Sequence, residues 1–456
     1  MKKMKFTKNF FTPTLIASAL ALSTTYANAA AFQLAEVSSS GLGRAYAGEA
    51  AIADNAAVVA TNPALMSLFN TKQFSIGGVY VQSKINMTGD VDVQLMGREV
   101  AKGNATKKNV VPAALVPNMY FVAPINDKFA VGAGMNVNFG LKSEYEPSYD
   151  AGVFGGTTEL TSINLNLSGS YRLAKGLSVG AGLNAIYAKA KIERRAGILE
   201  KAIRSAVQQL RGDPSLQGMV GKLSNVKSDT IVTQLQDNNA WAFGWNIGAV
   251  YEFNQGNRIG IAYHSKVDIN FKDSDALSSA GLIRGKGGLT LHLPDYLEFS
   301  GFHQLTEKFA MHYSYKYIKW SRLQSLHAVY DDGTEAFHKD EKFNDSSRVA
   351  LGATYNVNDK LTLRAGIAYD ESAANEHPSA SIPDTDRTWY SLGATYNFTP
   401  NLSVDFGFAH LRGKKLQFKE TQKIEIIKGT NFGSIDANYK STARANLYGL
   451  NLNYRF

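Results

Sequence analysis

The chain has 456 residues, of which 44% are hydrophobic, and it contains no cysteine. The lack of cysteine excludes a disulfide framework and thiol chemistry. Four of the nine excess positive charges fall within the first eight residues, and the remainder is too mild to indicate binding of nucleic acid. After the amino terminus, no run of about 18 apolar residues predicts a membrane-spanning helix.

The first 29 residues have the three parts of a secretory signal peptide. The first eight residues include four lysines, residues 14–22 are apolar, and Ala27 and Ala29 form a small-residue cleavage site. The apolar stretch is too short to cross a bilayer as a helix. We therefore predict that residues 1–29 direct export and that the mature chain begins near Ala30.

Residues 30–71 do not alternate in polarity, unlike the rest of the chain. They are rich in small residues, and short helical or turn segments are expected near residues 41–48 and 54–60. Asn62-Pro63 then interrupts the chain, because proline disfavours a helical conformation at the residue before it. We interpret this segment as a compact plug, distinct from the barrel wall that the later sequence predicts.

From residue 73 onward, segments of alternating polar and apolar residues recur with turn residues between them, as in β-strands. In the last ten residues, Leu450, Leu452 and Tyr454 share one face and the opposite face is mostly polar. We predict about fourteen strands, an even number as in bacterial single-chain barrels. The predicted strands span residues 73–88, 109–124, 128–143, 157–173, 176–194, 233–253, 257–272, 287–304, 308–330, 334–356, 360–373, 382–398, 401–424 and 435–456.

The connections between these strands alternate in length. Short turns such as residues 126–127, 306–307 and 399–401 alternate with longer connections. Outer-membrane barrels have this asymmetry, with short periplasmic turns and long extracellular loops. The 22 tyrosines and 24 phenylalanines also suit aromatic girdles at two membrane interfaces. The sequence therefore predicts an all-β protein, a 14-stranded antiparallel transmembrane barrel in a bacterial outer membrane.

Two of the long connections are apolar. Residues 195–227 contain apolar side chains at helical spacing from Leu199 to Leu210, followed by Gly212 as a stop signal. Residues 273–286 contain a second apolar patch around Leu277. Either the two loops pack on each other over the barrel mouth, or they leave a groove where an apolar ligand first lands.

Two further patterns have both a structural and a functional interpretation. Gly132, Gly134 and Gly140 interrupt one predicted strand, either to pack against the plug or to open a lateral exit in the wall. His312 and Ser314 share a strand face, as an outer-membrane phospholipase would require, but no Asn-Gly follows them. We interpret this pair as ordinary polar groups of the lumen, and we predict no catalytic site, metal or cofactor.

Segments along the chain closely resemble the FadL family of outer-membrane long-chain fatty-acid transporters. The resemblance covers nearly the whole mature chain. It rests on residues 32–54, 62–65, 116–127, 165–172, 188–194, 243–246, 381–387 and the carboxyl terminus. The resemblance implies a barrel closed by an N-terminal hatch, which takes up hydrophobic ligands from outside and releases them sideways into the membrane without an energy source.

The resemblance also implies roles for individual residues. Asn62-Pro63-Ala64 would be a hatch motif beside a lateral gap in the wall. Asn138-Phe139-Gly140 would be the kink in the third strand that forms this gap.

Four further residues would act on the ligand. Phe32 would move when ligand binds, and Arg194, Lys339 and Asp370 would line or gate an inner pocket. The loops at residues 195–227 and 273–286 would form a low-affinity landing groove.

A long-chain fatty acid can be captured by an apolar pocket without fuel. Burial of about sixteen methylenes at ~0.8 kcal/mol each gives a gross attraction of about 13 kcal/mol, offset by ordering costs. Lys339 or Arg194 would hold the carboxylate, since an unpaired buried charge is costly. We predict a monomeric transporter of long-chain fatty acids in contact with outer-membrane lipid and lipopolysaccharide. The alternatives are a transporter of aromatic hydrocarbons and a surface adhesin that binds a host receptor.

Overall fold

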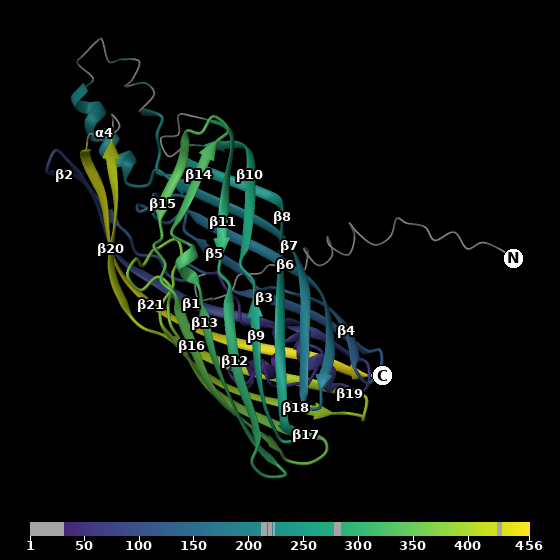
Figure 1. Ribbon diagram of the computed structural model, residues 1–456. Helices are drawn as coiled ribbons and strands as arrows, with labels where there is room; N and C mark the ends of the chain where they lie inside the picture. Colours follow the sequence, from purple (N-terminus) through teal and green to yellow (C-terminus); the bar gives the residue numbers. More distant parts are fainter. Residues whose placement is uncertain (1–31, 211–216, 218–220, 222–223, 278–283, 426–430) are drawn as a thin grey trace.

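A closed antiparallel β-barrel forms most of the molecule (Figure 1). The sheet closes because β1 (Gln73–Leu95) pairs with β3 (Ala114–Pro124) on one side and with β21 (Asn431–Arg455) on the other. Closure pairs the first and last strands, so neither of them forms an open sheet edge in the membrane. The prediction of a 14-stranded antiparallel barrel is confirmed. The computed structural model describes residues 32–210, 217, 221, 224–277, 284–425 and 431–456.

Several of the fourteen crossings consist of two consecutive strand segments. β2 (Arg98–Asn104) is an additional strand that pairs with the distal end of β1. In chain order the crossings are β1; β3; β4 (Phe129–Asn136) with β5 (Gly140–Glu144); β6 (Thr157–Ala174); β7 (Leu177–Arg195); β8 (Ile231–Asn254); β9 (Asn257–His264) with β10 (Val267–Leu277); β11 (Arg284–Leu293) with β12 (Tyr296–Gln304); β13 (Phe309–Ile318) with β14 (Ser325–Tyr330); β15 (Glu335–Asp340) with β16 (Ser346–Asn356); β17 (Leu361–Asp370); β18 (Arg387–Asn397); β19 (Leu402–Gly413) with β20 (Leu416–Glu425); and β21.

Large apolar side chains cover the outward face of the wall. On β21, Leu450 is 54% exposed while the next residue, Asn451, is 1% exposed. Leu183, Phe243 and Leu392 are also exposed on other strands. This arrangement is the reverse of a soluble sheet, and it places an apolar surface against lipid and polar groups inside. The sequence-based assignment of the terminal strand's apolar face to lipid agrees with this pattern.

Residues 371–386 differ from the prediction, because they fold into the lumen instead of extending the strands on either side. β17 ends at Asp370 and β18 begins at Arg387, whereas strands over 360–373 and 382–398 were expected. The carboxylate of Asp384 accepts hydrogen bonds from the Ser372 hydroxyl (2.7 Å) and the Ala373 N–H (3.0 Å). These bonds close the segment on itself, and we refer to residues 371–386 as the inner loop.

The described helices are few and have at most twelve residues. α2 (Ser39–Leu42), α3 (Val58–Thr61) and the 3₁₀ helix η1 (Pro63–Leu68) belong to the amino-terminal segment, and η3 (Trp320–Arg322) separates β13 from β14. α4 (Leu199–Leu210) matches the predicted amphipathic helix. No helix of the described ranges is both long and apolar enough to cross a membrane.

The apolar connection predicted at residues 273–286 is mostly strand. β10 continues to Leu277 and β11 begins at Arg284, because the inward alternation of Ile269 and Phe271 carries on past a bulge after Asp273. The side chain of Leu277 is therefore buried in the wall. The rest of this connection, the predicted stop signal at Gly212 and the predicted signal peptide lie outside the described residues.

Candidate functional site

The amino-terminal segment, residues 32–69, lies inside the barrel and is bonded to the wall at many points. The Ser39 hydroxyl donates to the Asn451 side chain (2.6 Å), the Tyr120 hydroxyl donates to the Val37 carbonyl (2.7 Å), and Arg348 donates to the Ala45 carbonyl (2.9 Å). The donors and acceptors come from strands on different sides of the wall. Such buried polar contacts fix the position of the segment, since each missing bond would leave a buried donor or acceptor without a partner, which costs free energy.

Asn62 forms the most extensively bonded point of this segment. Its side-chain amide donates to the carbonyls of Ala50 (2.8 Å) and Ala249 (3.1 Å), and its side-chain oxygen accepts from the Ala64 N–H (3.1 Å), which caps η1. A Cβ on Gly248 would overlap the Asn62 side chain, and glycine is therefore required for this close approach.

The Asn62-Pro63-Ala64 motif thus lies against β7 and β8, where Gly180 also leaves room for its backbone. The role of this motif beside a gap in the third strand stays a prediction. The backbone of Phe32 and Leu34 bonds directly to that strand.

The third crossing is interrupted between β4 and β5. Asn136 pairs with Asn164 and Gly140 pairs with Thr161, so three residues of this strand lie opposite two residues of β6. The extra residue takes Asn138 and Phe139 out of the ladder. The Gly140 N–H donates to the Phe32 carbonyl, and the Leu34 N–H donates to the Asn138 carbonyl, both at 2.8 Å. The start of the amino-terminal segment therefore pairs with the interrupted strand from inside.

The wall is also unpaired on the other side of this strand. β3 pairs with β4 only from Met119 to Pro124, and the next bond between the two crossings joins the Glu144 N–H to the Val110 carbonyl. Between these two contacts, the described residues show no ladder pairing between the second and third crossings. This opening in the ladder, which we call the lateral gap, lies beside the interruption at residues 137–139.

Gly132 and Gly134 lie on β4 below the lateral gap and pack against the amino-terminal segment. A Cβ on Gly132 would crowd Met66 and Val59, and one on Gly134 would crowd Tyr120 and Val59. This geometry favours the packing interpretation for these two glycines. Gly140 instead begins β5 at the interruption.

A continuous apolar cluster fills the lumen beyond the amino-terminal segment. Phe32 and Phe139 contribute to it from the interrupted region, and the ring of Phe32 lies 6.5 Å from that of Trp320. Strands on several sides of the barrel contribute the remainder. The larger buried members include Leu141, Leu160, Ile186, Ile192, Leu235, Ile269, Phe271, Leu289, Leu291, Leu293, Ile318, Leu323, Leu326, Phe343 and Ile382.

Buried charged groups border this cluster on the extracellular side. Lys339 donates to Glu341 (2.9 Å) and to the hydroxyls of Ser379 (2.5 Å) and Ser381 (2.8 Å) of the inner loop. Arg194 is 3% exposed and donates to backbone carbonyls and to a threonine hydroxyl. Glu341 is fully buried and interacts electrostatically with Arg194 and Lys339. Two of the predicted ligand-binding residues therefore lie in one charged group.

Burial changes the proton affinities of these extracellular groups. Loss of hydration raises the pKa of Glu341, although Lys339 opposes this effect. Burial also lowers the pKa of Arg194 to about 10, although the negative charges of Glu420 and Glu341 act to raise it. Arg194 therefore stays positively charged at neutral pH, without a carboxylate in direct hydrogen-bond contact among the described residues.

Asp370 belongs to a second charged group, near the start of the amino-terminal segment. Its carboxylate accepts from Arg387 at 2.8 Å, and its strand neighbour on the other side is Arg348. The carboxylate of Glu36 is buried nearby and has no hydrogen-bond partner among the described residues. A cavity of about 20 Å³ lies between these residues and has room for about one water molecule.

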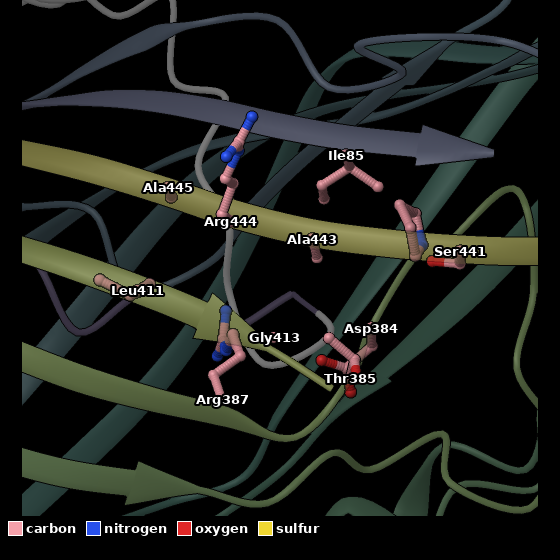
Figure 2. A pocket seen from close by; sticks show the side chains of 11 residues that line it. Ile85, Asp384, Thr385, Arg387, Leu411, Gly413, Ser441, Ala443, Arg444 and Ala445 are labelled. Atoms are coloured by element: carbon pink, nitrogen blue, oxygen red, sulfur yellow. The ribbon is translucent and has the colours of Figure 1, made fainter. Parts of the chain in front are cut away.

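A similar small cavity lies on the other side of Arg387, under the inner loop. Figure 2 shows Asp384, Thr385 and Arg387 beside Ile85 of β1 and Ser441 of β21, which are nearby strands of the same part of the wall. Its volume is also about 20 Å³, too small for an acyl chain. Arg387 therefore lines two small cavities, and the apolar side-chain cluster of the lumen is a separate feature.

Sequence analysis missed Trp320, Glu36 and Glu341. A continuous strand over 308–330 was expected, but η3 interrupts it and turns Trp320 into the lumen. The lost alternation after Ile318 is the signal that marks this break. Glu36 and Glu341 carry no such signal, because burial of a single acid depends on the folded surroundings.

His312 and Ser314 hold the amino-terminal segment rather than form a reactive pair. The Ser314 hydroxyl accepts from the Gly48 N–H (2.7 Å), and His312 Nε2 lies 3.0 Å from the Thr354 hydroxyl. Neither of these two bonds links the histidine to the serine, as activation of a nucleophile would require.

Comparison with known proteins matches residues 20–456 to the family described as outer membrane protein transport protein (OMPP1/FadL/TodX). The chain is 61% identical to outer membrane protein P1 of Haemophilus influenzae, over 98% of this chain and 99% of that protein. It is 41% identical to the long-chain fatty acid transport protein of Escherichia coli K12, with the same coverage.

Solved structures show the same fold. A FadL homologue of Pseudomonas aeruginosa superimposes with a TM-score of 0.77 at 22% identity, over 93% of this chain and all of that chain. The Pseudomonas putida toluene transporter TodX gives a TM-score of 0.59 at 16% identity, over 89% of this chain and 95% of that chain. The family consists of transport proteins of hydrophobic compounds rather than enzymes. Given the family match and these relatives, the chain belongs to the OMPP1/FadL/TodX family of outer membrane transport proteins.

Proposed function

We propose that this protein takes up long-chain fatty acids from the cell exterior and releases them sideways into the outer membrane without an energy source. The observation that supports this most directly is the apolar cluster in the lumen, with the buried Arg194 and the partly buried Lys339 at one border and the lateral gap at another. An acyl chain needs the apolar surface, its carboxylate needs a cation, and its release needs an opening toward lipid.

Capture of the ligand uses the extracellular border of the cluster. Lys339 and Arg194 bind the carboxylate, while the acyl chain replaces side-chain contacts within the apolar cluster. Burial of each methylene contributes about 0.8 kcal/mol, so a long chain is strongly preferred over a short one. The amphipathic helix α4 and its neighbours serve as the first landing surface, because the apolar face of α4 is continuous with apolar groups of the barrel mouth.

Release of the ligand follows from a movement of the start of the amino-terminal segment, which acts as a hatch. Phe32 belongs to the apolar cluster and is also bonded through its carbonyl to Gly140. An acyl chain that displaces the Phe32 ring therefore weakens the cover of the interrupted strand. The ligand then passes Asn138 and Phe139 and leaves through the lateral gap.

Deletion of Asn138 tests the exit. It leaves two residues of the third crossing opposite two residues of β6, so that a regular ladder can form. Uptake of labelled oleate should then fall to the level of cells that lack the protein. Asn138→Ala keeps the extra residue and should transport like the wild type. Surface levels of the folded barrel must be matched. Undiminished uptake by the deletion variant would contradict release at this point.

Lys339→Ala tests the carboxylate contact. A charge-assisted hydrogen bond contributes about 1.5–3 kcal/mol, so oleate should bind the purified variant at least about tenfold more weakly. Binding of octadecene, which lacks the carboxylate, should be unchanged. Lys342→Ala is the control, since Lys342 is exposed and pairs with Asp340 at the surface. Equal losses for both ligands would favour the second candidate, a transporter of uncharged hydrocarbons.

A row of cations on the outer surface supports the proposed contact with lipopolysaccharide. Lys84, Arg444 and Arg412 lie directly opposite one another on β1, β21 and β19, and all three are exposed. Like charges in directly opposed positions destabilise a sheet unless an anion lies between them. The phosphates of lipopolysaccharide supply such anions. Arg412→Gln with Arg444→Gln should reduce the lipopolysaccharide that copurifies with the barrel, and no reduction would exclude this site.

A further inference from the structure

Three side chains with metal-binding groups lie together on the outward face of β14 and β15, away from the lumen. His327 Nε2 lies 3.3 Å from Glu335 Oε2, and His338 Nδ1 lies 3.8 Å from the same oxygen. One donor atom from each residue lies within 4.8 Å of the others. The three side chains are 46%, 61% and 40% exposed, so an ion can reach them from solvent.

The β14–β15 hairpin brings these residues together by means of a bulge. His327 and His338 are directly opposite in the ladder, whereas Glu335 and His338 are three positions apart and would point to opposite faces of a regular strand. The register shifts so that Ala328 pairs with Phe337 and Val329 pairs with Glu335. The extra residue is thereby absorbed and Glu335 turns outward, as bulges re-aim side chains at other sites.

The two distances from the histidines to Glu335 are close to those around a four-coordinate ion. Zinc binds nitrogen and oxygen at about 2.0–2.2 Å in tetrahedral sites, which places two ligand atoms about 3.3 Å apart. The separation of His327 Nε2 from the glutamate oxygen matches this value, and that of His338 Nδ1 is about half an ångström longer. Small side-chain rotations at an exposed site are enough to close that difference.

Asp340 orients one of the histidines. Its Oδ1 atom lies 3.0 Å from His338 Nε2, the ring nitrogen that faces away from Glu335. A hydrogen on Nε2 that donates to Asp340 leaves the lone pair of Nδ1 directed at the cluster. Metal-binding histidines characteristically have such a carboxylate partner on their second nitrogen.

We infer that His327, Glu335 and His338 bind a divalent transition-metal ion, for which zinc is the best match. Two imidazoles and one carboxylate suit zinc and its neighbours better than calcium or magnesium, which prefer oxygen ligands. Three protein ligands leave a fourth position open to the exterior. The hairpin lies at the end of the barrel that carries α4 (Figure 1), so the site would be extracellular. This proposal departs from the sequence-based expectation that the chain holds no metal.

Zinc titration of the full-length barrel in detergent, purified without a histidine tag, tests the site. The wild type should bind one zinc ion per chain. The double variant His327→Gln with His338→Gln should bind at least tenfold more weakly. His303→Gln is the matched control. His303 lies on β12, outside the cluster, and its ring nitrogens bond to Asn257 and Tyr313. Equal affinity of the double variant and the wild type would overturn the proposal.

Cobalt provides a second readout that is independent of affinity. Cobalt bound to the wild type should give the strong visible absorption of a four-coordinate ion, and the double variant should lose it. Asp340→Asn should keep the absorption but weaken zinc binding about 10- to 100-fold, as expected for a positioning residue. Weak, octahedral-type absorption from the wild type would mean that cobalt binds only adventitiously, and would overturn the proposal.

Discussion

The two ends of the amino-terminal segment are held in the barrel by different kinds of contact. At the later end, Asn62 bonds to two carbonyls and packs against Gly248, and Ser67 bonds to Ser170 of β6. At the earlier end, the Phe32 carbonyl and the Leu34 N–H each bond to the backbone of the interrupted strand, and the Phe32 ring contacts Trp320 of η3. The first end contacts a continuous wall, and the second contacts a crossing whose pairing is broken on both sides.

This difference indicates one fixed end and one releasable end. Local opening requires less free energy where fewer buried contacts must be broken. The earlier end is also the part of the segment that contacts the apolar cluster, where the ligand is proposed to bind. Under the proposed function, a ligand would displace the earlier end while the later end stays bonded to the wall.

The largest expected effect is that of locking the releasable end. Gln33 and Phe139 are paired across an antiparallel bridge, where Cα atoms lie about 4.5–5.5 Å apart, a spacing that suits a disulfide. Because the chain has no cysteine, Gln33→Cys with Phe139→Cys introduces a single possible bond. Oxidation should reduce oleate uptake at least tenfold, and reduction should restore it.

A lock at the fixed end is the matched control for this experiment. The hydroxyls of Ser67 and Ser170 lie 3.0 Å apart, so cysteines at these positions can also form a disulfide. Oxidation of this pair should leave uptake near the wild-type rate. If both locks stopped transport, the segment would have to move as a whole. If neither did, the segment would not move during transport.

Disruption of the fixed end should have a smaller effect, on stability. Gly248→Ala places a Cβ where the Asn62 side chain lies, and overpacking of this kind costs about 1–3 kcal/mol. Thermal unfolding of the purified barrel should occur at a lower temperature, and protease should cleave the amino-terminal segment faster. Gly169→Ala is the control, because the nearest atom to its Cβ is 3.9 Å away. Equal behaviour of the two variants would show that the later end is not tightly packed.

The barrel could be predicted from the sequence because its pattern is local. Alternation with a period of two and the turn spacing fix each crossing, and the last strand is readable from ten residues. The interruption near Asn138 followed from the family resemblance. The inward course of the inner loop could not be predicted, because it depends on hydrogen bonds that Asp384 and Asp386 accept from Ser372 and Ala373 only in the folded chain.

The arrangement of the candidate site was less predictable, because it depends on which distant segments meet. The resemblance pointed to Asn62-Pro63-Ala64 and to the interrupted strand, but not to the packing of the motif against β7 and β8. The four predicted ligand-binding residues also separate in space. Arg194 and Lys339 lie near Glu341, Asp370 pairs with Arg387, and Phe32 lies in the apolar cluster.

The smallest expected effect concerns capture of the ligand at the extracellular border of the apolar cluster, away from both ends of the amino-terminal segment. Glu341 competes with a ligand anion for Lys339. Burial raises the pKa of Glu341, so its carboxylate takes up a proton at a higher pH than an ordinary glutamate does. Protonation removes the competing charge. Binding of an anionic ligand should therefore strengthen as the pH falls from neutral toward the usual glutamate range.

Glu341→Gln isolates this effect, because glutamine carries no charge at any pH. The variant should bind an alkyl sulfonate several-fold more tightly than the wild type at neutral pH, and its affinity should vary little with pH. A sulfonate is needed because it stays ionised over the whole pH range, whereas a fatty acid itself gains a proton.

The disulfide lock of the releasable end, introduced into the Glu341→Gln background, should form at an unchanged rate without ligand, since Glu341 touches neither end of the segment. A changed rate would mean that the charged border and the releasable end are coupled even before ligand arrives.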